Sequence, residues 1–188
     1  VLSGEKLDAD LKRLRDRRAQ SVLRLARLNA LLSNHDRLSQ SALMREGVSA
    51  HPWLLASEEG VLASHRDALA ASVASLRAKQ SQQRAIAAAQ ADQAETMRVE
   101  LDSYDSRVEA LSKLVQRRAT PRLRLLELQA DRAEAKARLI STIGASEQAK
   151  LSVNALGADI DTLIAERRAA WSTEAAEAEA EAADLATQ

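Results

Sequence analysis

The side chains best suited to chemistry are sparse in this chain and poorly spaced. His35, His51 and His65 are its only histidines and there is no cysteine, so no set of ligands stands at a spacing that holds zinc. Ser64, His65 and Asp67 are close in sequence, but adjacent residues of one helix do not face each other. No Gly-rich phosphate loop is present. The sequence therefore predicts no catalytic residue, no metal and no cofactor, and a protein that is not an enzyme.

Charge is unevenly distributed, although 27 basic and 27 acidic residues cancel over the chain. The central cations are Arg107, Lys113, Arg117, Arg118, Arg122 and Arg124. Only Glu109 opposes them, whereas 172–188 carries acids and no base. Helix-end preferences and a solvated face are the plainer explanation. The functional alternative is a basic segment that orients a polar or acidic partner. No aromatic residue lies among these cations to stack on bases, so we predict no nucleic-acid partner.

Composition predicts that long helices carry these charges. Ala, Leu, Arg, Glu, Gln and Lys are strong helix formers, and the 188 residues hold only 5 Gly, 2 Pro, 2 Trp, 1 Tyr and no Phe. Such a chain is typical of a coiled coil rather than of a compact aromatic core. No apolar run reaches the roughly 20 residues that span a bilayer. We expect a soluble fragment of a longer protein.

Leucine spacing and two prolines divide the chain into segments. Leucines of the first helix recur at three- and four-residue steps, and Pro52 disfavours helix before it. Ser57 is an N-cap for the second helix. Thr120 and Pro121 suit the cap and first position of the third. The predicted segments are an N-terminal helix (1–33), an irregular joint (34–56), an ascending helix (57–118), a tip turn (119–121) and a descending helix (121–188).

Two such long helices joined by so short a link predict an antiparallel hairpin. The fold class is all-α: a long antiparallel coiled-coil hairpin with an additional N-terminal helix. Placing Arg118 opposite Pro121 pairs the two apolar stripes, which we call the seam. This register pairs Leu111 with Leu128, Met97 with Thr142, Ile86 with Val153 and Leu76 with Leu163. The middle of the seam, 80–94, holds Gln and Ala at its core positions, so we expect weaker packing there.

The predicted register leaves residues 1–50 without a partner on the descending helix. The first helix therefore either folds back into a local three-helix bundle or pairs elsewhere. We expect the descending helix not to pair with residues 1–30, because the register assigns it to the ascending helix. Contact between the descending helix and residues 1–30 would contradict this register.

The order of these pieces resembles a known family. The strongest stretch is LVQRRATP at 114–121 followed by RLLEL at 124–128, with further similarity around RLNA at 27–30 and from 139 to 168. In this respect the chain is similar to the membrane fusion proteins, or periplasmic adaptors, of bacterial type I secretion (hemolysin D type). The likeness covers most of the chain.

The resemblance implies a hairpin that links an inner-membrane ABC transporter to a TolC-type outer-membrane duct. It implies several copies associated in a ring, a periplasmic location and an inner-membrane anchor outside this sequence. It also implies that the first two helices run end to end. Many relatives carry Arg, Leu and Ser at fixed tip spacing. Arg107 and Leu111 fit the first two, but Arg118 occupies the Ser position. The expected duct-binding residues, chosen by location, are Leu111, Leu114, Arg117, Arg118 and Thr120.

Two other functions fit parts of the pattern. Three helices suit a cytoskeletal or tethering coiled coil such as a spectrin-like repeat, although unequal helix lengths count against it. A hairpin with a basic tip also suits the coiled-coil arm of a chromosome-organising ATPase. Flanking sequence distinguishes these alternatives, since an adaptor requires a membrane helix and two β-rich halves.

Overall fold

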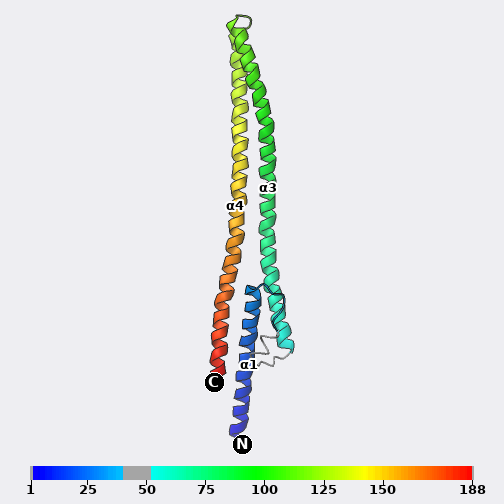
Figure 1. Cartoon of the computed structure of the whole chain (residues 1–188), viewed down its shortest axis with the longest axis vertical. Coiled ribbons are helices and arrows are strands. Elements are labelled where there is room, and N and C mark those ends of the chain that lie inside the picture. Colours follow the sequence, from blue (N-terminus) through cyan, green and yellow to red (C-terminus); the bar gives the residue numbers. More distant parts are fainter. Residues whose placement is uncertain (1, 40–51, 188) are drawn as a thin grey trace. The chain divides into compact units, whose positions relative to one another are not determined.

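Three helices account for nearly all of the residues that the computed structural model describes, 2–39 and 52–187. They are α1 (Leu2–Leu32), α3 (Pro52–Gln116) and α4 (Arg122–Thr187), shown in Figure 1. No strand occurs within these described ranges. The predicted all-α hairpin with an additional N-terminal helix is confirmed. The chain divides into unit 1 (Val1–Ala74 with Ile160–Gln188) and unit 2 (Ser75–Asp159).

Helix α3 begins earlier than the sequence predicted. It starts at Pro52 rather than at Ser57, because proline lacks only the N–H that the first helical residue cannot use and its φ is already helical. The predicted irregular joint therefore ends before Pro52, and its part from 40 to 51 lies outside the described residues. Helix α4 begins at Arg122, one residue from the predicted start and within the usual spread of helix ends.

The core of unit 1 is built from all three helices. Leu23 and Leu28 of α1 and Leu62 of α3 are the largest fully buried side chains. Trp171 of α4 is 7% exposed and belongs to the same cluster. The other buried members are Val22, Ala30, Leu31, Leu38, Ala175 and Ala178. Apolar burial of this kind is the main stabilising term in folding, so unit 1 is a three-helix bundle centred on these residues.

Helix α1 folds back into a local three-helix bundle, which was one of the two predicted alternatives, so two other expectations about it are wrong. It lies beside α3 and not end to end with it, and it contacts α4 as well. The Arg24 guanidinium is 3.7 Å from the Glu174 carboxylate, and the Arg168 guanidinium donates to the Leu32 carbonyl at 3.4 Å. Numbers rise along α1 as they fall along α4, so these two helices are antiparallel (Figure 1).

Contact between α4 and α1 does not displace α3 from α4. Trp171 still shares a surface hollow with Ala68 and Leu69 of α3, as the predicted register requires. The expectation that α4 would not contact residues 1–30 is wrong because it gave α4 a single partner. Successive side chains of a helix point in different directions, so one helix can pack against two neighbours.

Unit 2 contains α3 and α4 packed along the predicted seam. Thr142 donates its hydroxyl to the Met97 sulfur at 3.4 Å, which confirms that predicted pair. The Ser146 hydroxyl donates to the Ala87 carbonyl at 3.1 Å, and the Gln80 amide donates to the Val153 carbonyl at 3.0 Å. The Gln/Ala section thus holds its two helices partly by side-chain donors that reach the opposite backbone.

One predicted pair in the seam is wrong. Ile86 is 40% exposed and Ala87 is buried, and the Val153 carbonyl lies against Gln80 instead of Ile86. That pair was obtained by counting residues from the turn, whereas the core position is Ala87, one of the Gln and Ala residues that the predicted seam already contained. Gly157 lies close to the opposite helix, since a Cβ there would be 3.3 Å from the Gln80 amide nitrogen.

Two helices end in the same hydrogen-bonded motif. At the end of α3, Ala119 N–H donates to Leu114 O at 2.9 Å and Arg118 N–H donates to Val115 O at 3.0 Å. This pair of bonds is the Schellman motif, with Arg118 at the left-handed position at a φ of 60°. Asn34 takes the equivalent place after α1, with φ 56°. The α3 motif stops the helix and opens the turn to α4.

Replacing Trp171 with alanine should strongly destabilise unit 1. The side chain fills the bundle, so Trp171→Ala should lower the free energy of unfolding by about 3–5 kcal/mol. Trp53→Ala is the matched control, because Trp53 is 66% exposed, and it should change stability by less than about 0.5 kcal/mol. Chemical denaturation followed by circular dichroism measures both, and equal effects would disprove the assigned core.

Replacing Arg118 with glycine should stabilise the turn. A non-glycine residue in the left-handed region costs about 1–2 kcal/mol, and the greater unfolded freedom of glycine returns part of that. We expect Arg118→Gly to raise the free energy of unfolding by roughly 0.5–1 kcal/mol. Arg118→Ala, which keeps the strain, should show no such gain in the same denaturation experiment. A gain for alanine equal to that for glycine would argue against the left-handed conformation.

Candidate partner-binding tip

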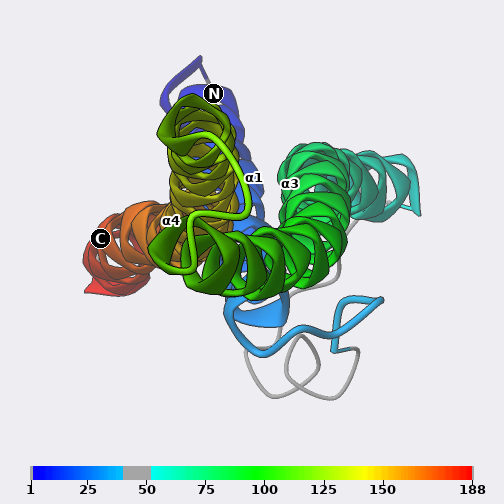
Figure 2. The ribbon, with the colours of Figure 1, turned by 90° about the horizontal axis from the view of Figure 1, so that it is seen from above.

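The tip is the reversal between α3 and α4, together with the last turns of α3 and the first turns of α4. The Schellman motif ends α3 after Gln116, and Pro121 cannot continue a hydrogen-bonded turn, so α4 starts at Arg122. Figure 2 shows the link crossing from one helix to the other. A chain that reverses in so few residues leaves its turn side chains little to pack against.

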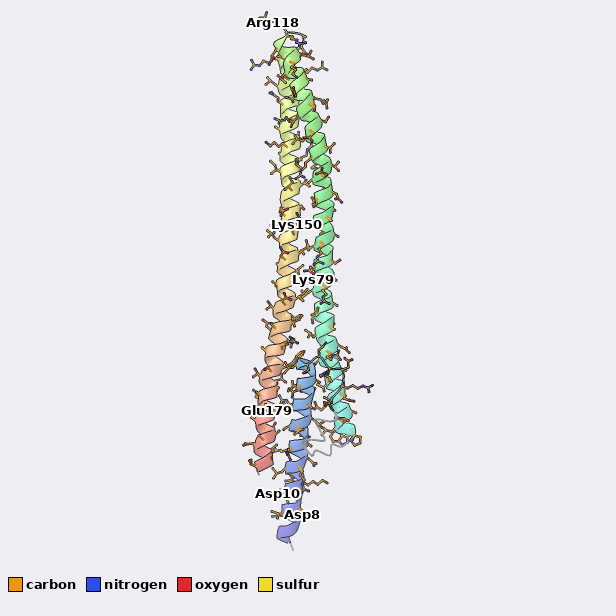
Figure 3. All side chains as sticks on the ribbon, in the orientation of Figure 1. Asp8, Asp10, Lys79, Arg118, Lys150 and Glu179 are labelled. Atoms are coloured by element: carbon orange, nitrogen blue, oxygen red, sulfur yellow. The ribbon has the colours of Figure 1, made fainter. Side chains whose placement is uncertain are left out.

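The five predicted tip residues all lie at this reversal, but their exposure differs. Arg117 and Arg118 are exposed, and Figure 3 shows Arg118 at the turn itself. Leu114 is 45% exposed, whereas Leu111 and Thr120 are half-buried. The turn therefore offers two guanidinium groups and one leucine directly to solvent.

Among the described residues, only some of the cations between Arg107 and Arg124 contact other side chains of the chain. Lys113 donates to the Glu109 carboxylate at 2.6 Å, and the Arg107 guanidinium lies over the Tyr104 ring, 5.6 Å from its centroid. The hydrogen bond from Lys113, with its positive charge, holds the pKa of Glu109 below the ordinary value. The exposed side chains of Arg117, Arg118, Arg122 and Arg124 form no ion pair within the described ranges.

A shallow groove of about 390 Å³ lies between the two helices just below the turn. Leu111 and Leu114 of α3 and Leu128 of α4 supply its apolar surface. Charged and small residues complete the lining: Arg107, Ala110, Arg124, Glu127 and Asp131. Arg107 and Leu111, the two positions that fit the tip spacing of the resembled adaptors, thus line the same groove. An apolar floor with charged edges is suited to a protein side chain.

Two exposed leucines at the tip were missed by the sequence reasoning. Leu123 is 65% exposed and Leu126 is 50% exposed. They are three residues apart on α4, so they share one face. The signal was present, because Leu125 and Leu128 already fill the seam and a helix cannot turn all four leucines inward.

The described part of the chain holds no candidate metal centre. Among those residues no group of three or more His, Cys, Asp or Glu side chains gathers around a possible ion. None of the described helices contains a stretch apolar enough to cross a membrane.

Comparisons with known proteins agree with this architecture. The family described as "AprE, long alpha-helical hairpin" matches residues 7–188. The solved soluble domain of LipC, described as a membrane fusion protein of a type I secretion system, superposes with a TM-score of 0.88. Sequence identity is 21%, and the alignment covers 96% of this chain and 85% of that one. No curated protein gives a significant match.

The two comparisons carry different weight. The LipC likeness, at its low identity, establishes the fold. The family match extends over almost the entire sequence, and it confirms the resemblance to secretion adaptors that the order of the helical segments indicated. The chain belongs to the AprE long α-helical hairpin family.

Proposed function

We propose that this chain is the adaptor hairpin of a type I secretion system. In this role it links an inner-membrane ABC transporter to a TolC-type outer-membrane duct, and its tip docks on the duct. Membership of the hairpin family and the likeness to a membrane fusion protein support the assignment. The parent protein would be anchored in the inner membrane by regions outside these residues, and the hairpin would stand in the periplasm.

The observation that carries the docking role is the pairing of exposed cations with exposed leucines at the turn. A charged group that has no ion-pair partner among the described residues keeps its field for another surface, where it fixes orientation and excludes wrong partners. Exposed leucines add the apolar area on which affinity depends. Both occur together at the reversal, and the duct surface that receives them should carry acidic groups around an apolar patch.

Each predicted tip residue has a distinct proposed role. Arg117 and Arg118 orient the tip by charge. Leu114 enters the duct surface, and Leu111 forms the floor of the groove that receives a duct side chain. Thr120 is half-buried, so it contacts the duct from the edge of the turn. Several copies associate in a ring, which presents a set of tips to the duct.

One observation favours an alternative. The three-helix bundle of unit 1 is the arrangement expected of a tethering repeat. Yet α1 has 31 residues and α3 and α4 have 65 and 66, and a repeat needs legs of similar length to stack on its neighbours. The arm of a chromosome-organising ATPase would instead use the basic tip on DNA. The purified chain would then bind DNA, and loss of the tip cations would weaken that binding, whereas an adaptor hairpin is expected not to bind DNA.

Reversing the tip charge should abolish export. In the full-length adaptor, Arg117→Glu with Arg118→Glu should leave helicity unchanged, because both side chains are exposed. Secretion of the cargo should fall to background, because two attractive contacts become repulsive. Cargo in the culture medium is the measurement, with circular dichroism of the variant as the check on folding.

A matched pair of substitutions shows whether the position of the charge change matters, and not only the change in net charge. Arg77→Glu with Arg84→Glu makes the same change in charge at exposed positions of α3 away from the tip, and secretion should be retained. Arg118→Gly keeps the turn and removes one cation, so secretion should be intermediate. Undiminished secretion in the tip double variant would mean that these arginines merely end a helix.

A further inference from the structure

The outward side of α4 in unit 2 carries an uncharged stripe of small and apolar residues. We call it the α4 stripe; its members, all exposed, are Leu126, Ala130, Ala133, Ala137, Ile140 and Gly144. They recur at alternating steps of four and three residues, which is the spacing of a coiled-coil core. Outward positions of a coiled coil normally carry polar or charged side chains. The α4 stripe is therefore suited to packing against another helix.

The outward side of α3 carries a second uncharged stripe. We call it the α3 stripe; its members, all exposed, are Thr96, Val99, Ser103, Ser106 and Ala110. They follow the same three- and four-residue steps. The Thr96 and Ser106 hydroxyls donate to carbonyls of their own helix at 3.2 Å and 3.0 Å, so burial of this stripe would not leave these donors unpaired.

The two stripes point away from each other within one hairpin. Ala135 and Leu139 of α4 and Ala94 of α3 are buried in the seam, and the helical repeat places each stripe on roughly the far side of its helix. One chain cannot bring its own two stripes together. Each stripe can be covered only by a different molecule.

We propose that the α4 stripe of one copy packs against the α3 stripe of the next copy, with the two helices antiparallel. The contact joins two different faces, so a pair of copies still has one free stripe of each kind, and further copies can be added until a ring closes. The proposal rests on the proposed function in one respect, namely that copies stand side by side in a ring. It adds the faces that meet, their direction and their register.

A ring fixes the register of this contact. Copies related by rotation about one axis stand at the same height, so the facing residues are those at equal heights within a single hairpin. The contact between Thr142 and Met97 marks one such height. Ile140 and Val99 each lie two residues nearer the turn, about 3 Å along the axis. These two side chains are 60% and 65% exposed, and the ring would bring them together.

The charges beside the two stripes are complementary in this register. Lys136 flanks one side of the α4 stripe, and Asp102 flanks the side of the α3 stripe that faces it in an antiparallel pair, at a height that differs by about 2 Å. On the other side, Glu134 comes within about one helical turn of Arg107 of the next copy. All four side chains are exposed, and none forms an ion pair within the described ranges. A parallel pair would instead bring Lys136 to the side of Arg107, where like charges repel.

A second copy matches this surface in a way that an unrelated helix does not. Glu95 and Glu109, on the same side of the α3 stripe as Asp102, are each paired with a base of their own chain. Asp102 lies between them without an ion pair among the described residues, and Lys136 stands at its height. An α4 stripe that met another α4 stripe would stop at two copies. The proposed contact is expected to be weak alone and to become effective when neighbouring copies are held close.

Disulfide trapping between two different single-cysteine variants tests the contact on the purified 188-residue chain, which has no cysteine. Ala137→Cys in the α4 stripe and Ser103→Cys in the α3 stripe lie at matching heights, and a disulfide needs Cβ atoms within about 4.5 Å. One variant carries a size tag, so that mixed and same-residue dimers differ in mass. After mild oxidation of an equal mixture, mixed dimers should exceed either same-residue dimer roughly tenfold, whereas random collision gives about twofold.

Ala89→Cys is the matched control for register. Ala89 is exposed and continues the α3 stripe two heptads, or about 21 Å, away from Ser103. Mixed with Ala137→Cys it should give only the random proportion of mixed dimers, and an excess equal to that of Ser103→Cys would overturn the register. A random proportion for Ser103→Cys itself, or a majority of Ala137→Cys dimers, would overturn the contact.

A chain that carries both Ala137→Cys and Ser103→Cys distinguishes a continuing contact from a closed pair. Oxidation should link it into trimers and larger species, because every copy offers both stripes. Products that end at the dimer would overturn the proposal.

Exchanging two charges should break the contact and then restore it. Lys136→Glu added to the Ala137→Cys variant, or Asp102→Lys added to the Ser103→Cys variant, should each reduce the mixed dimer severalfold, because like charges then face each other. The two changed variants together should regain it, and failure to do so would overturn the pairing of Lys136 with Asp102. These assays require neither duct nor transporter. Negative results alongside tip-dependent secretion would therefore refute the contact between the stripes and leave the adaptor role standing.

Discussion

The reversal at 117–121 is the constraint on which the remaining arrangement of unit 2 depends. The α3 helix must stop before α4 can return along it, and it stops because Arg118 takes a left-handed conformation that closes a Schellman motif. Pro121 then prevents the helix from resuming without a break. The contacts along the seam join residues that are far apart in the sequence, and this short link brings those residues together. The exposed tip is a consequence of the same geometry.

Two different kinds of packing follow within the two units. Unit 1 has a third helix, and its core contains Leu23, Leu28 and Trp171. Unit 2 has two helices, which cannot enclose large side chains completely. Mostly small residues such as Ala87 and Ser146 are buried there together with Leu139, and hydrogen bonds from side chains to the opposite backbone supplement the apolar contact. A two-helix arrangement also leaves the outward side of each helix available to other molecules.

Much of this fold is predictable from the sequence, because heptad spacing and helix-end chemistry are local signals. The hairpin, its turn and the pairing of Met97 with Thr142 follow from them. The position of α1 does not, since a leucine stripe shows that a helix needs a partner and not which face of which helix provides it. The pairing of Ile86 with Val153 fails because it was counted from the turn, whereas Ala87 holds the buried heptad position. The reversal lies between Gln116 and Arg122, but the sequence reasoning did not single out Leu123 and Leu126, although Leu125 and Leu128 already occupy the seam and leave these two leucines facing outward.

The distance between Ser103 on α3 and Glu134 on α4 tests the reversal most directly. Both residues are exposed, and a chain without native cysteines accepts a spin label at each after substitution by cysteine. Antiparallel helices about 10 Å apart predict a label-to-label distance on the order of 20 Å. A helix that continued through 117–121 would place the same residues about 46 Å apart at 1.5 Å per residue. The antiparallel hairpin predicts a narrow distribution near the shorter distance, and a dominant population near the longer one would contradict it.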